Sequence, residues 1–238
     1  MLKSAAMKFR ILCFGSHLLL SLLIALLAVG VVFWLWYPAP LDKALGVTNI
    51  FILLLCVDVI VGPLLTFIVA KQGKKTLTID LLTIGIIQLL ALSYGLYIVA
   101  QGRPVWMVYD SGRFELVQAY EAVTDENQSS ENFTLSVTGP VWGAVKKQLP
   151  TSVDSGDAYY KAEFLQTYDE KIAADVSVHI MNIALLNRFN EPAKVSTVLS
   201  AYPEANAFVP MAAKNQPVVV LVNKEKGYPI AIVDLLPW

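Results

Sequence analysis

The chain has 238 residues, 56% of them hydrophobic, and a formal net charge of −1 at pH 7. Residues 101–238 hold eleven Lys or Arg against sixteen Asp or Glu, which gives this part a net charge of −5. Because nucleic-acid binding needs clustered Lys and Arg to neutralise phosphates, this balance argues against nucleic acid as a partner.

Three long apolar runs fill the first hundred residues. They are Ile11–Trp36, Val47–Ala70 and Ile79–Ala100, of 26, 24 and 22 residues. At a rise of 1.5 Å per residue, about 20 apolar residues cross the hydrocarbon core of a bilayer. The sequence therefore predicts a three-helix transmembrane domain in residues 1–100, with the lipid bilayer as a partner. A cleaved signal peptide is the alternative for the first run, which is far longer than a signal h-region.

Positive charges indicate the orientation of these helices. Three basic residues precede the first run and three lysines fill the loop 71–75, whereas in the loop Tyr37–Gly46 Lys43 is offset by Asp42. Cationic short loops stay on the cytoplasmic side. We therefore expect a cytoplasmic N-terminus and residues 101–238 on the opposite side.

Each predicted helix carries one polar side chain near the middle of the bilayer. Counted from the cytoplasmic end, Asp58 lies roughly 18 Å deep, Ser21 about 15 Å and Gln88 about 13 Å. An ionisable group at this depth costs about 2.5–3.5 kcal/mol on insertion scales and usually faces protein or water. Two interpretations stay open: a structural hydrogen-bond cluster with Asp58 protonated, or a site that docks a partner or handles protons.

Gly62 and Pro63 follow Asp58 in the second run. Proline lacks a backbone N–H and frees the carbonyl of Val59, and the glycine beside it lets the helix kink. The pair predicts a groove in the second span that admits another helix. By the same count of depth, His17 is displaced from Asp58 by two turns.

The sequence offers little for catalysis. Asp80 is expected to cap the third helix, far in depth from Asp58, whereas an intramembrane aspartyl protease needs two carboxylates in one site. The tail has no phosphate-binding glycine loop, no histidine pair at metal spacing and no nucleophile elbow. We therefore expect a protein that is not an enzyme and that needs no metal or cofactor.

The tail, residues 101–238, shows the pattern of a mixed domain. Val105–Tyr109 and Phe114–Val117 predict one hairpin, and Pro217–Val222 and Pro229–Leu235 predict a second. Strands at both ends with helices between them indicate an α+β domain whose terminal strands are adjacent in one sheet. The predicted fold class is three transmembrane helices followed by a C-terminal α+β domain.

Further elements are expected between the two hairpins. The alternation in Phe133–Val137 predicts a third strand. Aromatic and apolar residues recur every four positions over 157–174 and predict an amphipathic helix, and residues 175–188, ambiguous between helix and strand, favour a helix. Glu191-Pro192 opens a short helix that stops before Pro203.

Several blocks of residues carry a family resemblance. They are Asp58–Thr66, Ile79–Leu82, Gln88, Tyr94–Tyr97, Arg103–Trp106, Arg113-Phe114 and Asp234–Trp238. These blocks resemble the type IV pilin accessory proteins of the TfpX/TfpZ type. The resemblance implies a bacterial inner-membrane protein with a periplasmic tail that assists or modulates the assembly or stability of its pilin, without catalytic residues. It implies the type IV pilin subunit as partner, and leaves other pilus assembly proteins as further ones.

The helix pattern and the resemblance join in one hypothesis. Pilins are held in the membrane by an apolar N-terminal helix, and a groove lined by Asp58, Gly62 and Pro63, with Ser21 and Gln88 nearby, would receive that helix. Two other functions stay open at this point. One is a membrane-anchored envelope sensor or adaptor, and the other is a small proton-coupled transporter that uses Asp58.

Overall fold

The computed structural model describes residues 2–124, 133–151, 153 and 155–238. By its contacts the chain divides into two compact units. The first, called the helical unit below, comprises Met1–Trp34 and Val47–Ala100, and the second, the sheet unit, comprises Leu35–Gly46 and Gln101–Trp238. A boundary between independent domains at residues 100 and 101 stays a prediction, and the contacts group the loop Leu35–Gly46 with the residues that follow Ala100.

Long apolar helices make up the helical unit. They are α1 (Leu2–Gly30), continued by the π-helical segment η1 (Val31–Trp36), α3 (Val47–Val69) and α4 (Leu77–Gln101). Among the described residues, three spans are long and apolar enough to cross a membrane: Ala5–Trp36, Val47–Val69 and Leu77–Gln101. The three predicted runs are thus confirmed as helices. Many of their large apolar side chains are exposed, as expected of surfaces that contact lipid.

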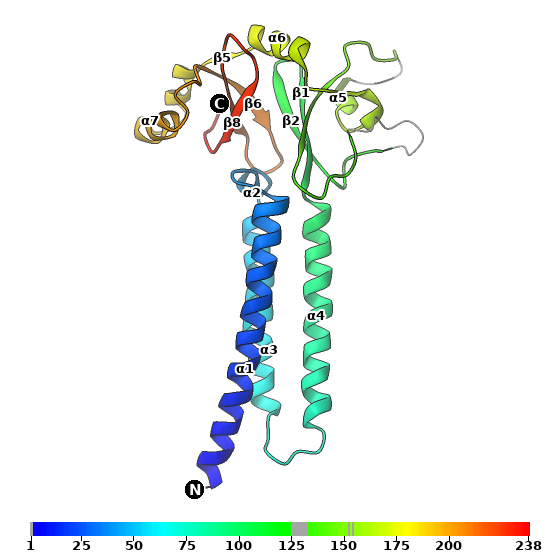
Figure 1. The fold of residues 1–238 in the computed structure, drawn as a ribbon, viewed down its shortest axis with the longest axis vertical. Coiled ribbons are helices and arrows are strands. Elements are labelled where there is room, and N and C mark those ends of the chain that lie inside the picture. The colour runs from blue at the N-terminus through cyan, green and yellow to red at the C-terminus, as the bar shows by residue number, and fades with distance from the viewer. Residues whose placement is uncertain (1, 125–132, 152, 154) are drawn as a thin grey trace. The chain divides into compact units, whose positions relative to one another are not determined.

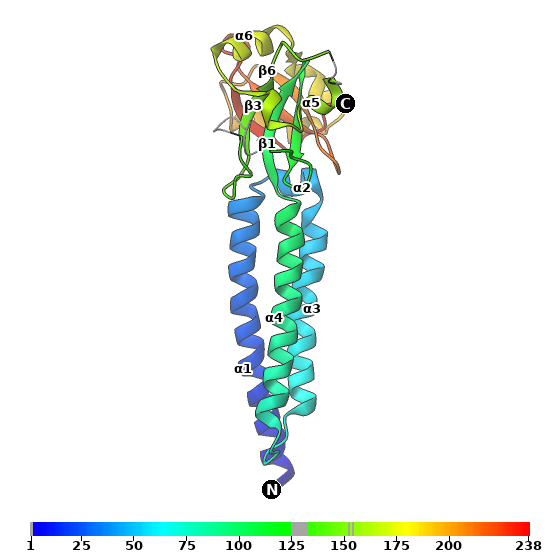
Figure 2. The same ribbon diagram turned by 90° about the vertical axis from the view of Figure 1, so that its right-hand side faces the viewer.

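Helices α1 and α3 pack against each other along their length; α1 lies in front of α3 in Figure 1, and Figure 2 shows both beside α4. Edge-to-face aromatic pairs join α3 to α1 and to η1: Phe14 of α1 lies 6.2 Å from Phe67, and Phe33 of η1 lies 5.6 Å from Phe51, measured between ring centroids. Arg10 Nε donates to the carbonyl of Ala70 at 3.0 Å, just past the end of α3. This bond satisfies a carbonyl at a helix end, where carbonyls lack intrahelical donors.

Helix α4 contacts α3 through a close approach at a glycine. A Cβ added at Gly95 would meet both terminal carbons of Leu54 at 2.5 Å, closer than real contacts allow. Glycine therefore lets the Leu54 side chain lie directly against the backbone of α4. The other close approach between these helices involves Gln88 and is described with the site.

One mixed sheet forms the framework of the sheet unit. Its strands are β1 (Pro104–Asp110), β2 (Arg113–Gln118), β3 (Val141–Val145), β4 (Leu165–Thr167), β5 (Met181–Asn182), β6 (Ala207–Ala212), β7 (Val218–Val222) and β8 (Pro229–Val233). In the described part of the chain, the strand order is β4-β3-β1-β2-β6-β7-β8, and β5 pairs with β6. The β1–β3 and β2–β6 pairs are parallel and the others antiparallel.

Short helices complete the sheet unit. They are α2 (Leu41–Leu45), α5 (Ser155–Ala158), α6 (Glu170–Val178), α7 (Pro192–Ser200) and the 3₁₀ helices η2 (Ala162–Phe164) and η3 (Ile183–Arg188). The fold class is therefore confirmed: transmembrane-type helices followed by an α+β domain. The predicted helix after Glu191 is also confirmed, as α7.

Both predicted hairpins are present. Strands β1 and β2 pair antiparallel around a two-residue turn in which Ser111 has φ 47° and Gly112 has φ 93°. Positive φ at both central residues is the geometry that suits a tight hairpin, and glycine adopts it at little cost. Strands β7 and β8 pair antiparallel as the second hairpin.

The predicted strand Phe133–Val137 is wrong. Carbonyls in this segment accept hydrogen bonds from the side chains of Arg103 and Trp106, and not from the backbone of a neighbouring strand. Arg103 donates to the carbonyls of Leu135 and Ser136 at 3.1 and 2.9 Å, and Trp106 Nε1 donates to that of Thr134 at 3.1 Å. The strand begins later, as β3 at Val141, after Gly139 with φ 85°.

The predicted helix over 157–174 is also wrong. Its middle, Leu165–Thr167, is strand β4, which pairs with β3. Helix α6 begins only at Glu170, because the side chain of Asp169 accepts a hydrogen bond from the backbone N–H of Ile172 and caps it there. Residues 175–188 are partly helical: α6 ends at Val178, and β5 and the 3₁₀ helix η3 follow.

The two hairpins share one sheet, but the prediction that the terminal strands are adjacent is wrong. Strand β6, which the sequence did not reveal, lies between β2 and β7. Its neighbour on one side changes along its length, from β5 beside Ala207 and Phe208 to β2 beside Met211 and Ala212. Pro210, which has no N–H to donate, lies between these two partners.

The loop between the first two spans contributes to the core of the sheet unit. Leu41 and Ala44 of α2 are buried in the same apolar cluster as Phe114, Val209 and Val220. Backbone N–H groups after β6 fix this insertion, since those of residues 215 and 216 both donate to the carbonyl of Ala44 at 3.1 Å. The sheet unit is therefore assembled from two separate stretches of chain.

Candidate functional site

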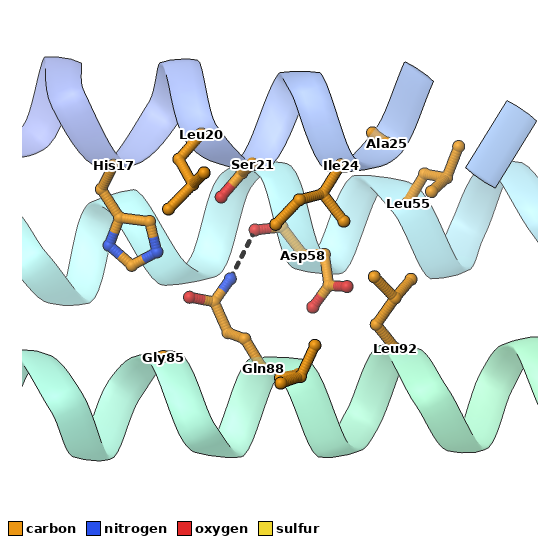
Figure 3. A pocket seen from close by; sticks show the side chains of 11 residues that line it. His17, Leu20, Ser21, Ile24, Ala25, Leu55, Asp58, Gly85, Gln88 and Leu92 are labelled. Atoms are coloured by element: carbon orange, nitrogen blue, oxygen red, sulfur yellow. Dashed lines mark hydrogen bonds between the residues drawn. The ribbon is translucent and has the colours of Figure 1, made fainter. Parts of the chain in front are cut away.

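The helical unit contains a cavity of about 90 Å³ between α1, α3 and α4 (Figure 3). Its wall is apolar except for a few side chains that converge from the three helices. The lining residues are His17, Leu20, Ser21, Ile24, Ala25, Leu55, Asp58, Gly85, Gln88, Leu89 and Leu92. Three of the residues singled out in the sequence, Ser21, Asp58 and Gln88, therefore meet in one place.

Gln88 connects α4 to α3. Its Nε2 donates to the backbone carbonyl of Asp58 at 2.8 Å, the bond drawn in Figure 3. Because that carbonyl accepts only, the amide nitrogen must face it and the amide oxygen must face away. The oxygen Oε1 is buried and has no hydrogen-bond partner among the described residues.

Gly62 makes room for this contact. A Cβ at Gly62 would overlap the amide group of Gln88, so only glycine lets the amide lie against the backbone of α3. Gly62 and Pro63 are both buried and do not line the cavity. The place beside Gly62 that the sequence suggested as a groove is taken by the chain's own Gln88, and a role of this pair in docking stays a prediction.

The carboxylate of Asp58 faces the space between α3 and α4 (Figure 3). The side chain is half-buried. Unlike Asp80, which pairs with Lys74 at 2.5 Å, it has no hydrogen-bond or ion-pair partner within the described ranges. An acid without a partner at mid-span is costly, so this group is the main chemical feature of the site.

His17 also lines the cavity, although its depth in the bilayer, counted along the sequence, placed it two helical turns from Asp58. One ring nitrogen, Nδ1, makes a hydrogen bond with the hydroxyl of Thr66 at 2.5 Å. Thr66, which is buried on α3, ends the resemblance block Asp58–Thr66 but was not expected to be a site residue. Its signal was available: a small polar residue one helical turn after Pro63 faces the same side as Gly62.

Asp80 does not cap α4 as expected. It lies within the first turn, where its backbone N–H donates to the carbonyl of Thr76 and its carboxylate accepts from the Thr76 hydroxyl at 3.3 Å. A negative charge in the first turn still interacts favourably with the helix dipole.

The sheet unit has a separate cluster of charges at Asp234, in the last of the resemblance blocks. Lys43 Nζ of α2 lies 2.8 Å from Asp234 Oδ2, Lys194 Nζ lies 3.6 Å from the same oxygen, and Gln216 Nε2 donates to Oδ1 at 3.1 Å. The hydrogen bond from Lys43 lowers the pKa of Asp234, and in return raises the pKa of Lys43. This cluster ties α2, α7 and the end of β8 together.

Neither unit shows an assembled metal centre. Within residues 2–124, 133–151, 153 and 155–238, no group of three or more His, Cys, Asp or Glu side chains is placed to hold an ion. The ring Nδ1 of His179 makes a hydrogen bond with the carbonyl of Asp175 at 2.9 Å.

The family model and the similar proteins that match this chain carry the same description, fimbrial assembly protein. The family model described as "Fimbrial assembly protein FimB" matches residues 5–46, which include most of α1 and all of α2. The fimbrial assembly protein of Dichelobacter nodosus serogroups C1 and C2 is 40% identical over 114 residues, which are 47% of this chain and 87% of that protein.

Further relatives come from the same organism. The serogroup I protein is 40% identical over 114 residues, and the chain spans 44% of its length. The serogroup A1 protein is 50% identical over 32 residues, 13% of this chain and 67% of that protein. No solved structure matches the chain.

Proposed function

The chain belongs to the fimbrial assembly protein family, a type IV pilus accessory family, and from this premise we propose that it assists or modulates the assembly of a pilin subunit. A role in fimbrial biogenesis follows from the family itself. Our proposal adds the bacterial inner membrane, the pilin as direct partner and a non-enzymatic mode of action. The comparisons lend no support to the sensor or the transporter.

We further propose that the sheet unit lies in the periplasm and that the N-terminus lies in the cytoplasm. The loop Leu35–Gly46 and the residues after Ala100 form one folded unit, so they must share one side of the membrane. The three spans agree with this: the loop after the first span and the residues after the third lie on the same side when each span crosses the membrane once. The opposite side then carries the short loop with Lys71, Lys74 and Lys75, and cationic loops of this kind stay cytoplasmic.

The cavity around Asp58 is the single observation that carries the proposed contact with a pilin. Its rim includes Leu20 and Leu89, whose side chains are 56% and 59% exposed on helices α1 and α4. A polar cavity with an apolar, lipid-facing rim suits a partner that approaches within the bilayer. The apolar helix that holds a pilin in the membrane is such a partner.

Photo-crosslinking in intact cells tests this function. A photoreactive residue at Leu89, on the rim, or at Ser111, at the tip of the β1–β2 hairpin, is expected to crosslink to pilin. The control position is Leu26, which is 66% exposed on α1 and does not line the cavity. If no position crosslinks to pilin, or if Leu26 crosslinks as strongly as Leu89, the pilin contact at the cavity is wrong.

A reporter fused after Trp238 tests the orientation separately. Alkaline phosphatase, which folds only outside the cytoplasm, is expected to be active in this fusion and inactive when it is placed in the loop 71–75. The reverse result would overturn the periplasmic placement of the sheet unit and the proposed function with it.

A further inference from the structure

We infer that the cavity in the helical unit binds a primary ammonium group that an apolar stem carries within the bilayer. This inference rests on the proposed function and names the chemistry that the same site recognises. It starts from two hydrogen-bond acceptors of the lining residues, the Asp58 carboxylate and Gln88 Oε1, which have no donor within the described residues.

The acceptors are set by the structure. The Asp58 carboxylate has no donor in the described part of the chain, and Gln88 Oε1 is buried without one. One N–H of Gln88 Nε2 is held by the Asp58 carbonyl, which fixes the orientation of the amide and leaves Oε1 without a donor. Ser21 adds a hydroxyl oxygen on the wall contributed by α1. A complementary ligand must therefore donate several hydrogen bonds, as an –NH₃⁺ group does with its three N–H donors.

Charge complementarity points to the same ligand. Several acids elsewhere in the chain lie beside cations, such as Asp80 beside Lys74 and Asp234 beside Lys43. No described Lys or Arg lies within ion-pair distance of Asp58, although it is the one acid in the middle of a span. A carboxylate in a poorly solvated site gains most from a cation that also donates hydrogen bonds.

Size and access limit what carries this group. A cavity of about 90 Å³ accommodates an ammonium group with its first methylene groups, and its lining has none of the Trp, Tyr or Phe rings that commonly hold a quaternary ammonium. The exposed rim residues Leu20 and Leu89 lead to the lipid-facing surface of the unit. The ligand therefore arrives on an apolar chain from within the membrane.

Decylamine is the simplest probe of this chemistry. With the full chain in phosphatidylcholine nanodiscs at pH 7, decylamine is expected to raise the midpoint of thermal unfolding in a saturable way. Decanol and decyltrimethylammonium, which lack an –NH₃⁺ group, are expected to raise it little. Asp58→Asn keeps the shape of the side chain and is expected to weaken decylamine binding about tenfold or more, whereas the matched control Asp80→Asn leaves it unchanged.

In proteins a primary ammonium comes from a helix N-terminus or from a lysine side chain, and two peptides distinguish these sources. Both are apolar Ala/Leu helices of 20 residues. One has a free N-terminus and no lysine, and the other is N-acetylated with one central lysine. Capture of either one by the wild-type chain, and not by Asp58→Asn, supports the inference and identifies the source.

The inference is overturned if decylamine and decanol raise the midpoint of thermal unfolding equally, or if Asp58→Asn binds decylamine as well as the wild type. These outcomes are separable from failure of the proposed function. Asp58→Asn that loses decylamine binding but still crosslinks to pilin would leave the ammonium site standing and remove pilin as its ligand.

Discussion

Lys43 and Asp234 are 191 positions apart in the sequence, yet their side chains meet at 2.8 Å. The lysine lies in α2, between the first two spans, and the aspartate lies directly after β8. This ion pair joins the two stretches of chain from which the sheet unit is built. It gives the loop between the spans a structural role in the folded domain, beyond that of a connection.

The Lys43–Asp234 pair makes a small, pH-dependent contribution to stability. Lys43 is 59% exposed, so Lys43→Met is expected to lower the free energy of unfolding of the sheet unit by only about 0.2–1 kcal/mol. The pKa of Asp234 is lowered in the folded state, so its stabilisation is present above the unfolded-state pKa, about 3.9, and is lost as pH falls through the folded-state value. Urea titrations at pH 7 and pH 3 measure this, and Lys43→Met that is equally destabilising at both would contradict it.

Burial of Leu41 matters more than the ion pair beside it. Leu41 is 2% exposed in the core of the sheet unit, and Leu41→Ala is expected to cost about 2–5 kcal/mol because it leaves a cavity. Leu135→Ala is the matched control, since Leu135 is 40% exposed and its loss opens no cavity. Urea unfolding followed by tryptophan fluorescence gives both values. A cost below 1 kcal/mol for Leu41→Ala would show that α2 is not part of the core.

The chain elements that the sequence predicted are those with strong local signals. The three spans follow from length and apolarity alone, and the β1–β2 hairpin follows from Ser111-Gly112, whose positive φ angles the turn requires. Strand β6 was missed because Pro210 argues against a central strand. Proline is tolerated there since β6 exchanges β5 for β2 as its neighbour around that residue.

The errors and omissions elsewhere depend on contacts between residues distant in sequence. The four-residue recurrence over 157–174 belongs to strand β4, a cap at Asp169 and helix α6. Leu165 of β4 packs in one apolar cluster, and Ile172 and Val176 of α6 pack in another. For the site, the sequence predicted Ser21, Asp58 and Gln88, because each span carries one of these polar residues near its middle. The bond between Gln88 and the Asp58 backbone, and the bond from His17 to Thr66, required the packing of three helices.

Gly62 and Gln88 are expected to be energetically coupled. Gly62→Ala places a Cβ on the Gln88 amide, which must then leave the Asp58 carbonyl, and overpacking of this kind costs about 1–3 kcal/mol. In a Gln88→Ala background the same change has space and is expected to cost much less. Gly15→Ala is the control, since nothing lies within 4 Å of its Cβ position. Thermal unfolding in detergent of the four members of the cycle measures the coupling, and additive costs would refute the contact.

Arg103 is expected to hold the segment after residue 132 in its non-strand conformation. Its guanidinium donates to the carbonyls of Leu135 and Ser136, and burial lowers its pKa without removing the charge at neutral pH. Arg103→Met is therefore expected to cost about 1.5–3 kcal/mol, the range for hydrogen bonds to charged groups. The control Arg188→Met removes an exposed arginine that makes no hydrogen bond or ion pair among the residues that the structure describes, and should cost at most about 0.5 kcal/mol. Urea unfolding of both variants, together with faster amide hydrogen exchange in residues 134–138 of Arg103→Met alone, tests the assignment. Equal costs in the two variants would mean that these carbonyls do not depend on Arg103.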